Sequence, residues 1–102
     1  LLVSSAASDV YKRQVRGSSM SPSFSDRDLV LTLNFLPLKV NDVIVIKSID
    51  YGRVIKRIIN IENNLYQVGS DNNSYNSKVN SKFFSRKEIQ GKVLYKFSTK
   101  LF

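Results

Sequence analysis

Short runs of β-forming residues, separated by turn-forming residues, constrain the fold of this chain most. Each run is rich in Val, Ile, Leu, Tyr or Phe and is too short for a typical helix. The segments between the runs are rich in Ser, Asn, Asp, Gly and Pro, which favour turns. The pattern predicts an all-β, mainly antiparallel fold, a small coiled sheet or partly open barrel, with at most one helical turn near 85–88. The predicted strands are 28–33, 42–47, 52–59, 64–69 and 89–97.

The first fourteen residues differ in origin from the rest in our interpretation. Residues 4–14, SSAASDVYKRQ, can be back-translated in frame into a tagmentation adaptor used in sequencing libraries. The alternative is a native disordered N-terminus of small and polar residues. We therefore expect residues 1–14 to be an adaptor-derived scar, not native sequence. Residues 15–102 would then form one small domain whose native upstream part is missing.

The chain contains neither cysteine nor histidine. Their absence excludes disulfides, thiol nucleophiles, histidine-based catalytic triads and the usual zinc sites. We expect no cofactor and no bound metal. No apolar run is long enough to span a membrane, but an anchor in the missing upstream part would make the protein membrane-associated. Without such an anchor we expect a cytoplasmic protein of bacterial type.

Sixteen Lys and Arg residues against eight Asp and Glu residues give a net charge of +8. Such a charge raises nucleic acid or an anionic membrane as a partner. The basic residues are scattered, however, and form no stripe that would mark a groove-binding face. Nucleic-acid binding is therefore the minor interpretation. In that interpretation, six aromatic residues would stack against the bases. Aromatic residues that alternate along strands are more often part of a core, however. The six are Tyr66, Tyr75, Phe83, Phe84, Tyr95 and Phe97.

The run RVIKRII, residues 53–59, places two adjacent cations inside a predicted strand. Side chains alternate between the faces of a strand, so Lys56 lies on the face of Val54 and Ile58, while Arg57 lies on the other. Burial among apolar groups can neutralise a lysine, whereas the guanidinium group of arginine does not deprotonate in proteins. We therefore predict that Lys56 faces an apolar site and Arg57 faces outward. A neutral lysine can act as the base for a serine nucleophile.

A candidate nucleophile lies in RGSSMSPSF, residues 16–24. Gly17 relaxes the backbone before a turn and Pro22 restricts it afterwards, with Ser19 and Met20 between them. Taken alone, a serine-rich segment with one proline is usually an ordinary loop. Its significance depends on what accompanies it in the sequence.

Seven short motifs follow one another in a particular order. Together they resemble the serine-lysine peptidases of the type I signal peptidase and LexA-like (S24/S26) superfamily, the later ones in degenerate form. The motifs are GSSMSP (17–22), DLVL (28–31), NDVIV (41–45), IKRII (55–59), SDN (70–72), SYNSK (74–78) and GKVLYKF (91–97).

The resemblance implies a serine endopeptidase with the coiled β-sheet of those catalytic domains. Ser19 would attack the peptide carbonyl, and Lys56 would act as general base and later protonate the leaving amine. Ser74 would orient Lys56. A protein or peptide substrate would bind as an extended strand beside residues 15–18, and backbone N–H groups would hold the oxyanion. The oxyanion and substrate-strand residues would be Gly17, Ser18, Ser19 and Met20.

The chain also departs from the family pattern. The usual glycine before each structural aspartate is replaced by Arg27 and by Asn41, of which Asn tolerates left-handed backbone angles more readily. Asn76 and Lys78 replace an aspartate and an arginine, which removes an expected internal ion pair. The connection that leads to Ser74 is shorter than in signal peptidases, so these departures affect the implied role of Ser74 most.

Within the superfamily, the short spacing between Ser19 and Lys56 resembles that of the nickel superoxide dismutase maturation proteases. The closing strand, 91–97, also favours the signal-peptidase side. We therefore expect cleavage of a signal peptide or propeptide. One alternative is a LexA- or UmuD-like regulator that cleaves its own upstream linker. A second is a non-catalytic, basic β-barrel that binds nucleic acid.

Overall fold

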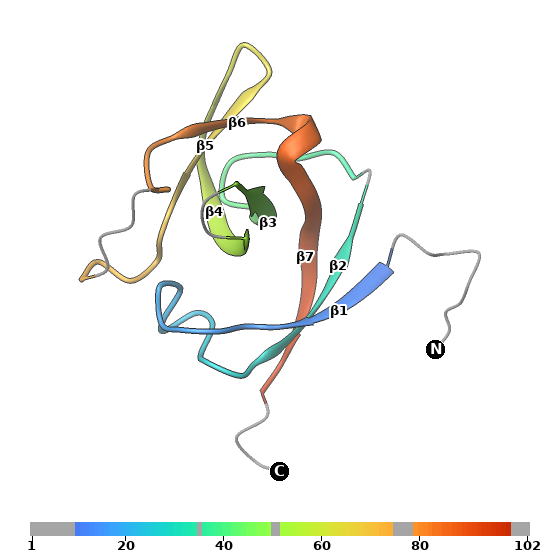
Figure 1. The fold of residues 1–102 in the computed structure, drawn as a ribbon, viewed down its shortest axis with the longest axis vertical. Coiled ribbons are helices and arrows are strands. Elements are labelled where there is room, and N and C mark those ends of the chain that lie inside the picture. Colours follow the sequence, from blue (N-terminus) through green and yellow to red (C-terminus); the bar gives the residue numbers. More distant parts are fainter. Residues whose placement is uncertain (1–9, 35, 50–51, 75–78, 99–102) are drawn as a thin grey trace.

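The computed structural model describes residues 10–34, 36–49, 52–74 and 79–98. Within these ranges the chain forms seven strands and a short 3₁₀ helix, η2 (Figure 1). No helix in these ranges is long and apolar enough to cross a membrane. The elements are β1 (Val10–Gln14), β2 (Leu29–Leu33), β3 (Val43–Ser48), β4 (Gly52–Glu62), β5 (Leu65–Gly69), β6 (Phe83–Ser85), η2 (Arg86–Glu88) and β7 (Ile89–Phe97).

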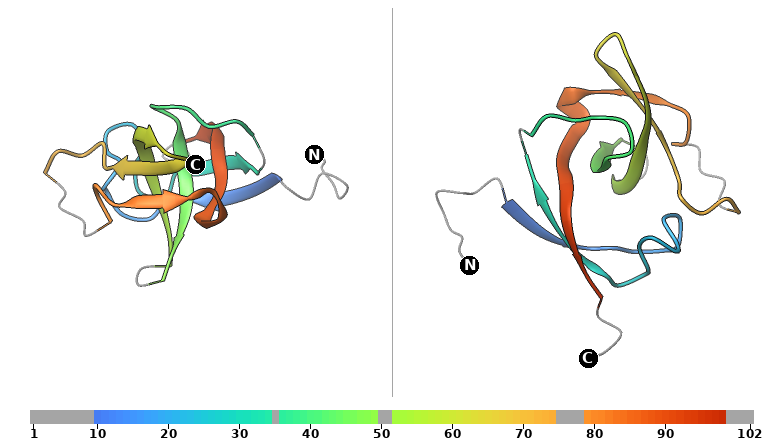
Figure 2. Two further views of the ribbon diagram at one scale, coloured as in Figure 1. Left: turned by 90° about the horizontal axis from the view of Figure 1, so that it is seen from above. Right: turned by 180° about the vertical axis from the view of Figure 1, so that it is seen from behind.

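All the strand pairs are antiparallel and belong to one open sheet with the order β1-β2-β7-β3-β4-β5-β6. The sheet curls around its own axis, as the three ribbon views show (Figures 1 and 2). The strands at its two ends, β1 and β6, do not pair with each other, so the barrel is incomplete. The predicted all-β class with a coiled, partly open sheet is confirmed.

The five predicted strands correspond to β2, β3, β4, β5 and β7, and the expected helical turn corresponds to η2. Sequence analysis missed β6, because its three residues are too few to show an alternating pattern. It also missed β1, which lies in the segment interpreted as an adaptor-derived scar. An edge strand is held mainly by backbone hydrogen bonds, which almost any sequence can form. The pairing of β1 therefore does not show whether its residues are native, and the adaptor origin of residues 1–14 stays a prediction.

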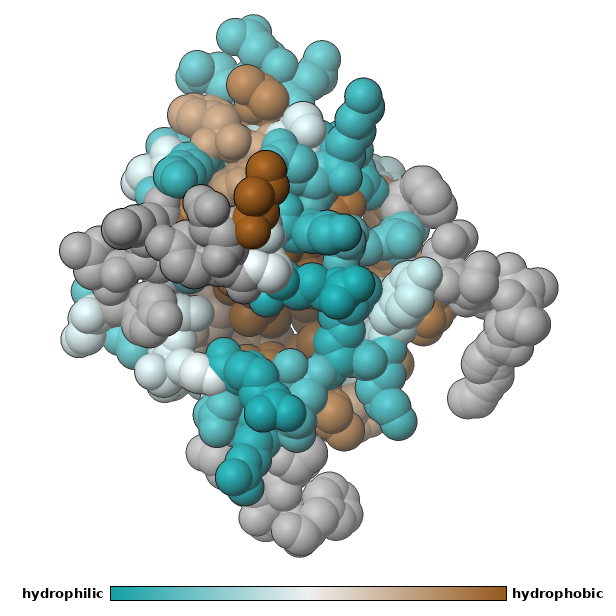
Figure 3. Space-filling view, in the orientation of Figure 1, coloured by the Kyte–Doolittle hydropathy of each residue, from teal (hydrophilic) through white to brown (hydrophobic). Residues whose placement is uncertain are grey.

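The buried side chains form two clusters, and β4 contributes to both. Ile58 belongs to the first cluster, whereas Ile55 packs against the second. Near the centre of the face seen in Figure 1, hydrophobic atoms are recessed behind hydrophilic ones (Figure 3). The first cluster consists of Ile44, Ile46, Ile58, Val68, Val79, Phe84 and Ile89, and the second of Val15, Met20, Phe24, Val30 and Val43.

Two turns with the same hydrogen bonds precede β2 and β3. In the first turn, the N–H of Ser25 donates to the carboxylate of Asp28 at 2.9 Å, and the N–H of Asp28 donates to the carbonyl of Ser25 at 3.1 Å. In the second, Lys39 and Asp42 form the same two bonds at 2.9 and 3.1 Å. Each aspartate therefore closes its own turn.

Both turns need a left-handed residue directly before the aspartate, and these residues are Arg27 (φ 76°) and Asn41 (φ 83°). These are the two positions where the family pattern has glycine. The N–H of Arg27 donates to the carbonyl of Val15 at 2.7 Å, and the N–H of Asn41 donates to that of Ile58 at 2.8 Å. The two turns thus fix the backbone near the candidate nucleophile and near the candidate base.

Replacing Arg27 with glycine should stabilise the fold. A non-glycine residue in the left-handed region costs roughly 1–2 kcal/mol, part of which is offset by the greater freedom of glycine in the unfolded chain. We expect Arg27→Gly to raise the free energy of unfolding by about 0.5–1 kcal/mol and Asn41→Gly to change it less, since Asn tolerates this region better. Urea denaturation measures both variants, and a less stable Arg27→Gly protein would contradict the prediction.

Candidate active site

Lys56 lies inside the protein, with only 2% of its surface exposed. It shares its face of β4 with Ile58, which is fully buried, and with Val54, which packs against the same core cluster. Burial lowers the pKa of its amine below the ordinary value, because the charged form loses its hydration. The predicted inward orientation of Lys56 is confirmed.

Arg57 lies on the opposite face of β4, as predicted, but it binds a partner there instead of extending into solvent. Its guanidinium group donates two hydrogen bonds to the carboxylate of Asp71, at 2.6 and 2.8 Å, and a third to the carbonyl of Asn41 at 2.7 Å. The bond from Arg57 lowers the pKa of the Asp71 carboxyl, and a bond from Ser23 lowers it further. Asp71 therefore links β4 to the loop that carries Ser19.

A serine hydroxyl contacts Lys56, but it is that of Ser70 instead of Ser74. The Nζ atom of Lys56 donates to Ser70 Oγ at 2.8 Å. Ser74 is exposed, and its N–H donates to the side chain of Asn72 at 3.0 Å in a tight turn that keeps it at the surface. The expectation that Ser74 orients Lys56 is therefore wrong: the hydroxyl that contacts Lys56 belongs to Ser70.

The strand register explains why Ser70 occupies this place. In the β4–β5 hairpin, Arg57 lies opposite Gly69, so the next pair along the two chains is Lys56 and Ser70. Sequence analysis missed this pair because one bulge between Ile58 and Asn60 shifts the register of the hairpin. Pairing the two predicted strands with one bulge would have found it.

The turn that carries Ser19 is anchored by its neighbour Met20. Met20 is 1% exposed and belongs to the second core cluster, whereas Ser19 is half-buried. The N–H of Ser21 donates to the carbonyl of Ser18 at 3.1 Å, which closes a turn with Ser19 and Met20 at its centre. Gly17 enters this turn with a φ of +85°, which favours glycine.

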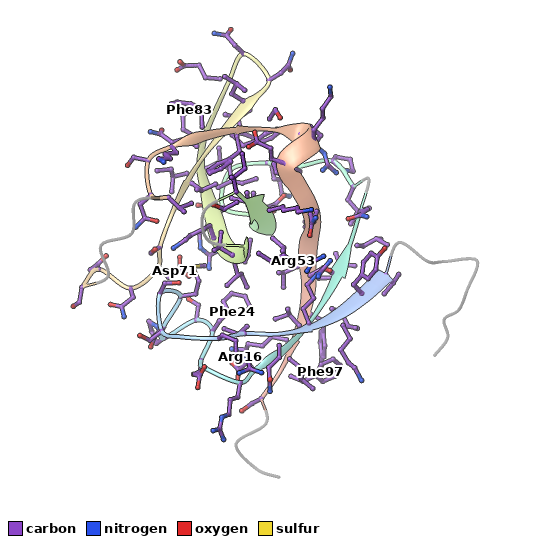
Figure 4. The ribbon with its side chains drawn as sticks, viewed as in Figure 1. Arg16, Phe24, Arg53, Asp71, Phe83 and Phe97 are labelled. Carbon is purple, nitrogen blue, oxygen red and sulfur yellow. The ribbon has the colours of Figure 1, made fainter. Side chains whose placement is uncertain are left out.

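The segment 70–72 contacts both candidate catalytic residues. Asn72 donates its backbone N–H to the carbonyl of Ser19 and its side-chain amide to that of Ser18, both at 2.9 Å. Ser70, two residues earlier, accepts the hydrogen bond from Lys56. Asp71, between them, is bound to Arg57 in the middle of β4 and lies beside the turn after β1 (Figure 4). The structure thus brings Ser19 and Lys56 to one short segment.

The backbone N–H groups of Ser19 and Met20 have no hydrogen-bond partner within the described part of the chain. The carbonyls of Ser18 and Ser19, which belong to the same two peptide groups, accept hydrogen bonds from Asn72. In a trans peptide the N–H and C=O bonds point in opposite directions. Both N–H groups are therefore directed away from Asn72 and are available to an oxygen anion.

The segment that leads to Ser19 also presents an unpaired edge. Val15 is bound on one side by the turn around Arg27 and Asp28. Arg16 is exposed, and its backbone groups have no partner among the residues that the structure describes. An extended peptide could pair with this edge next to Gly17 and Ser18.

The aromatic residues considered as stacking platforms do not form one surface. Phe84 is buried in the first core cluster, and Tyr66 packs against it. The exposed Phe83 and Phe97 lie at opposite ends of the molecule (Figure 4). Tyr75, Asn76 and Lys78 lie outside the described residues. Within the described ranges, no group of three His, Cys, Asp or Glu residues lies close enough together to hold a metal ion.

The pair of Arg57 and Asp71 should stabilise the fold in a pH-dependent way. Because the pKa of Asp71 is depressed in the folded state, its contribution is complete above the ordinary carboxyl range and is lost as the pH falls through the lowered value. We expect Asp71→Asn to reduce the free energy of unfolding by about 1–2 kcal/mol at pH 7, and by less at about pH 3. Urea denaturation at both values tests this, with the exposed Glu62→Gln on β4 as control; an equal loss at both values would contradict it.

Comparison with known proteins yields one match. The family described as Peptidase S24-like matches residues 1–94, which is most of the chain. No curated protein and no solved structure matches it. The match agrees with the all-β fold and with the superfamily indicated by the sequence motifs. The chain belongs to the Peptidase S24-like family of LexA-like serine peptidase domains.

Proposed function

We propose that this protein is a serine endopeptidase in which Ser19 is the nucleophile and Lys56 the general base. One observation carries the proposal: a fully buried lysine with a lowered pKa is held by the same segment that binds the carbonyl of Ser19. Membership of the S24-like family supports peptidase activity in general. The assignment of these two residues goes further and is our own.

In the proposed reaction, neutral Lys56 removes the proton from the Ser19 hydroxyl while the oxygen attacks the carbonyl carbon of the scissile peptide. The tetrahedral intermediate collapses to an acyl-enzyme, and the amine leaves with the proton that Lys56 had taken. Water then attacks the ester with Lys56 as base, the bond between the acyl group and Ser19 Oγ breaks, and Ser19 takes back the proton from Lys56 as the acid product leaves. The ordinary lysine pKa, near 10.4, would leave almost no neutral amine at pH 7, so the lowered pKa of Lys56 supports this role.

The surroundings of Ser19 support the same reaction. The free N–H groups of Ser19 and Met20 would donate to the oxyanion, a kind of stabilisation that is worth roughly 3–4 kcal/mol per donor in measured cases. The substrate would lie as an extended strand along Arg16, Gly17 and Ser18. Gly17 has no hydroxyl to contribute, so the backbone alone would hold the oxyanion.

We propose a signal peptide or propeptide as the substrate, on the basis of the compact motif spacing and the closing strand. Cleavage of an upstream segment of the same chain is the second candidate, supported by the S24-like family match. A peptide with small residues before the scissile bond, added in trans, distinguishes the two. Cleavage of the added peptide favours the first candidate, whereas processing only of a linked upstream segment favours the second.

Replacing either catalytic residue should abolish cleavage of this peptide or linked segment. We expect Ser19→Ala and Lys56→Met each to lower the rate by at least about a hundredfold, and Lys56→Arg not to restore it, because guanidinium remains charged. Lys56→Met should fold with equal or greater stability, since it removes an ionisable group from the interior. Cleavage and urea denaturation are measured on the same samples. Cleavage that persists in Ser19→Ala would falsify the assignment.

The rate of cleavage should rise with pH through the pKa of Lys56. Because burial lowers this pKa, the midpoint of the rise should lie below the ordinary lysine value of about 10.4. Rates measured from pH 5 to 10 with a peptide that lacks titratable groups test this expectation. A rate that still rises without a plateau at pH 10 would contradict it and would indicate a solvated amine.

A further inference from the structure

The hydrogen bonds behind Lys56 run in a fixed direction. Lys56 Nζ lies 2.8 Å from Ser70 Oγ, which in turn lies 3.0 Å from Asn80 Oδ1. The Ser70 hydroxyl has a single proton, and an amide oxygen can only accept a hydrogen bond. The proton of Ser70 is therefore donated to Asn80, and Ser70 presents a lone pair to Lys56.

This direction matters for a lysine that acts as a base. A neutral amine has one lone pair, and it needs that lone pair to take the proton from Ser19. A neighbouring hydroxyl that was free to rotate would donate its own proton into the same lone pair. By accepting the Ser70 proton, Asn80 prevents this competing bond.

We propose that Asn80 is a positioning residue of the Ser19–Lys56 site, which acts through Ser70 to keep the lone pair of neutral Lys56 available. The inference rests on the proposed function and adds to it a residue that none of the seven sequence motifs includes. Asn80 does not touch the substrate or the reacting atoms in this scheme. It fixes the orientation of the hydroxyl that touches the base.

Asn80 is well placed for this role because the residues on either side of it are held. Val79 is 2% exposed and belongs to the first core cluster. The N–H of Ser81 donates to the carbonyl of Val68 at 2.8 Å, and its carbonyl accepts a bond from Gln67 Nε2 at 3.1 Å. These contacts fix the backbone around Asn80 against β5.

The charged groups near Lys56 are paired or exposed, so they should not obscure a change in its pKa that is caused by a variant at position 80. Arg57, the next residue on β4, and Asp71, in the segment after β5, are bound to each other. Lys92 on β7, which lies across β3 from Lys56, is paired with Asp42 at 3.2 Å, and Lys47 on β3 and Lys82 after Asn80 are exposed. Burial is the cause of the lowered pKa of Lys56, so a charge placed at position 80 would add a new influence.

Acylation of Ser19 by p-nitrophenyl acetate tests the inference without knowledge of the natural substrate. The Ser19 oxygen forms an ester with the acetyl group, and p-nitrophenolate leaves and is followed by its absorbance. Intact mass counts the acetyl groups, and Ser19→Ala supplies the background and shows whether the acetyl group is on Ser19. Above the pKa of Lys56, where the amine is neutral, we expect Asn80→Ala to slow acylation about three- to tenfold, the effect of one hydrogen bond that competes for the lone pair. In the Ser70→Ala background the same change should alter the rate by less than about twofold.

The pKa of Lys56, measured by NMR with ¹³C-labelled lysine, separates this role from a merely structural one. In Asn80→Ala, Ser70 becomes free to donate to the neutral amine, so the pKa should fall by about 0.5–1 unit. A loosened structure would instead admit water and raise the pKa toward its ordinary value. Lys56→Met identifies the signal, and this measurement requires no activity.

Two further variants complete the test. Asn80→Asp keeps an acceptor and adds a negative charge, so it should raise the pKa of Lys56, move the pH–rate profile to higher pH and restore the rate there. Ser81→Ala removes an exposed side chain next to Asn80 and keeps the backbone bonds of residue 81, so it should leave both the pKa of Lys56 and the rate nearly unchanged.

The outcomes separate the two proposals. Equal effects of Asn80→Ala with and without Ser70, or a raised pKa in Asn80→Ala, would overturn the role of Asn80. Wild-type acylation that equals the Ser19→Ala background would overturn the proposed function instead. In that case the direction of the pKa shift still decides whether Asn80 controls the Ser70 proton.

Discussion

The ion pair of Arg57 and Asp71 is the interaction on which the candidate site depends. Asp71 lies between Ser70, which contacts the buried lysine, and Asn72, which binds the carbonyls of the serine turn. By joining Asp71 to β4 with two hydrogen bonds, Arg57 holds this whole segment in place. Two adjacent cations on one strand therefore have complementary tasks. One is buried for chemistry, and the other fixes the segment that faces the first.

Burial of the Lys56 amine lowers the stability of the folded protein, and the residues around it compensate for this cost. An amine buried to 2% exposure loses hydration, and only part of that loss is recovered through Ser70. Hydrophobic neighbours on both sides of β4, Ile55 and Ile58, keep the strand inside despite this cost. A group that reduces stability in a well-packed strand is typical of a site selected for reactivity.

Sequence reasoning reached the parts of the structure that depend on alternation and order. It predicted five strands and the inward direction of Lys56, because period-two patterns and burial chemistry are local properties. It missed the contact between Lys56 and Ser70, because a single bulge in the hairpin changes which residues face each other. It could not find Asn80, whose position is set by the distant packing of Val79 and by a bond from Ser81 to β5.

The open sheet has a consequence for the behaviour of the protein in solution. Its first strand leads along Arg16 to the serine turn, and the backbone groups of that residue are left unpaired among the described residues. Unpaired strand edges attract any extended chain, including a second copy of the same protein. A second copy of the protein and a substrate would therefore compete for the same hydrogen-bonding groups. A peptide inhibitor bound there would block both, so it would also keep the protein from associating with itself at high concentration.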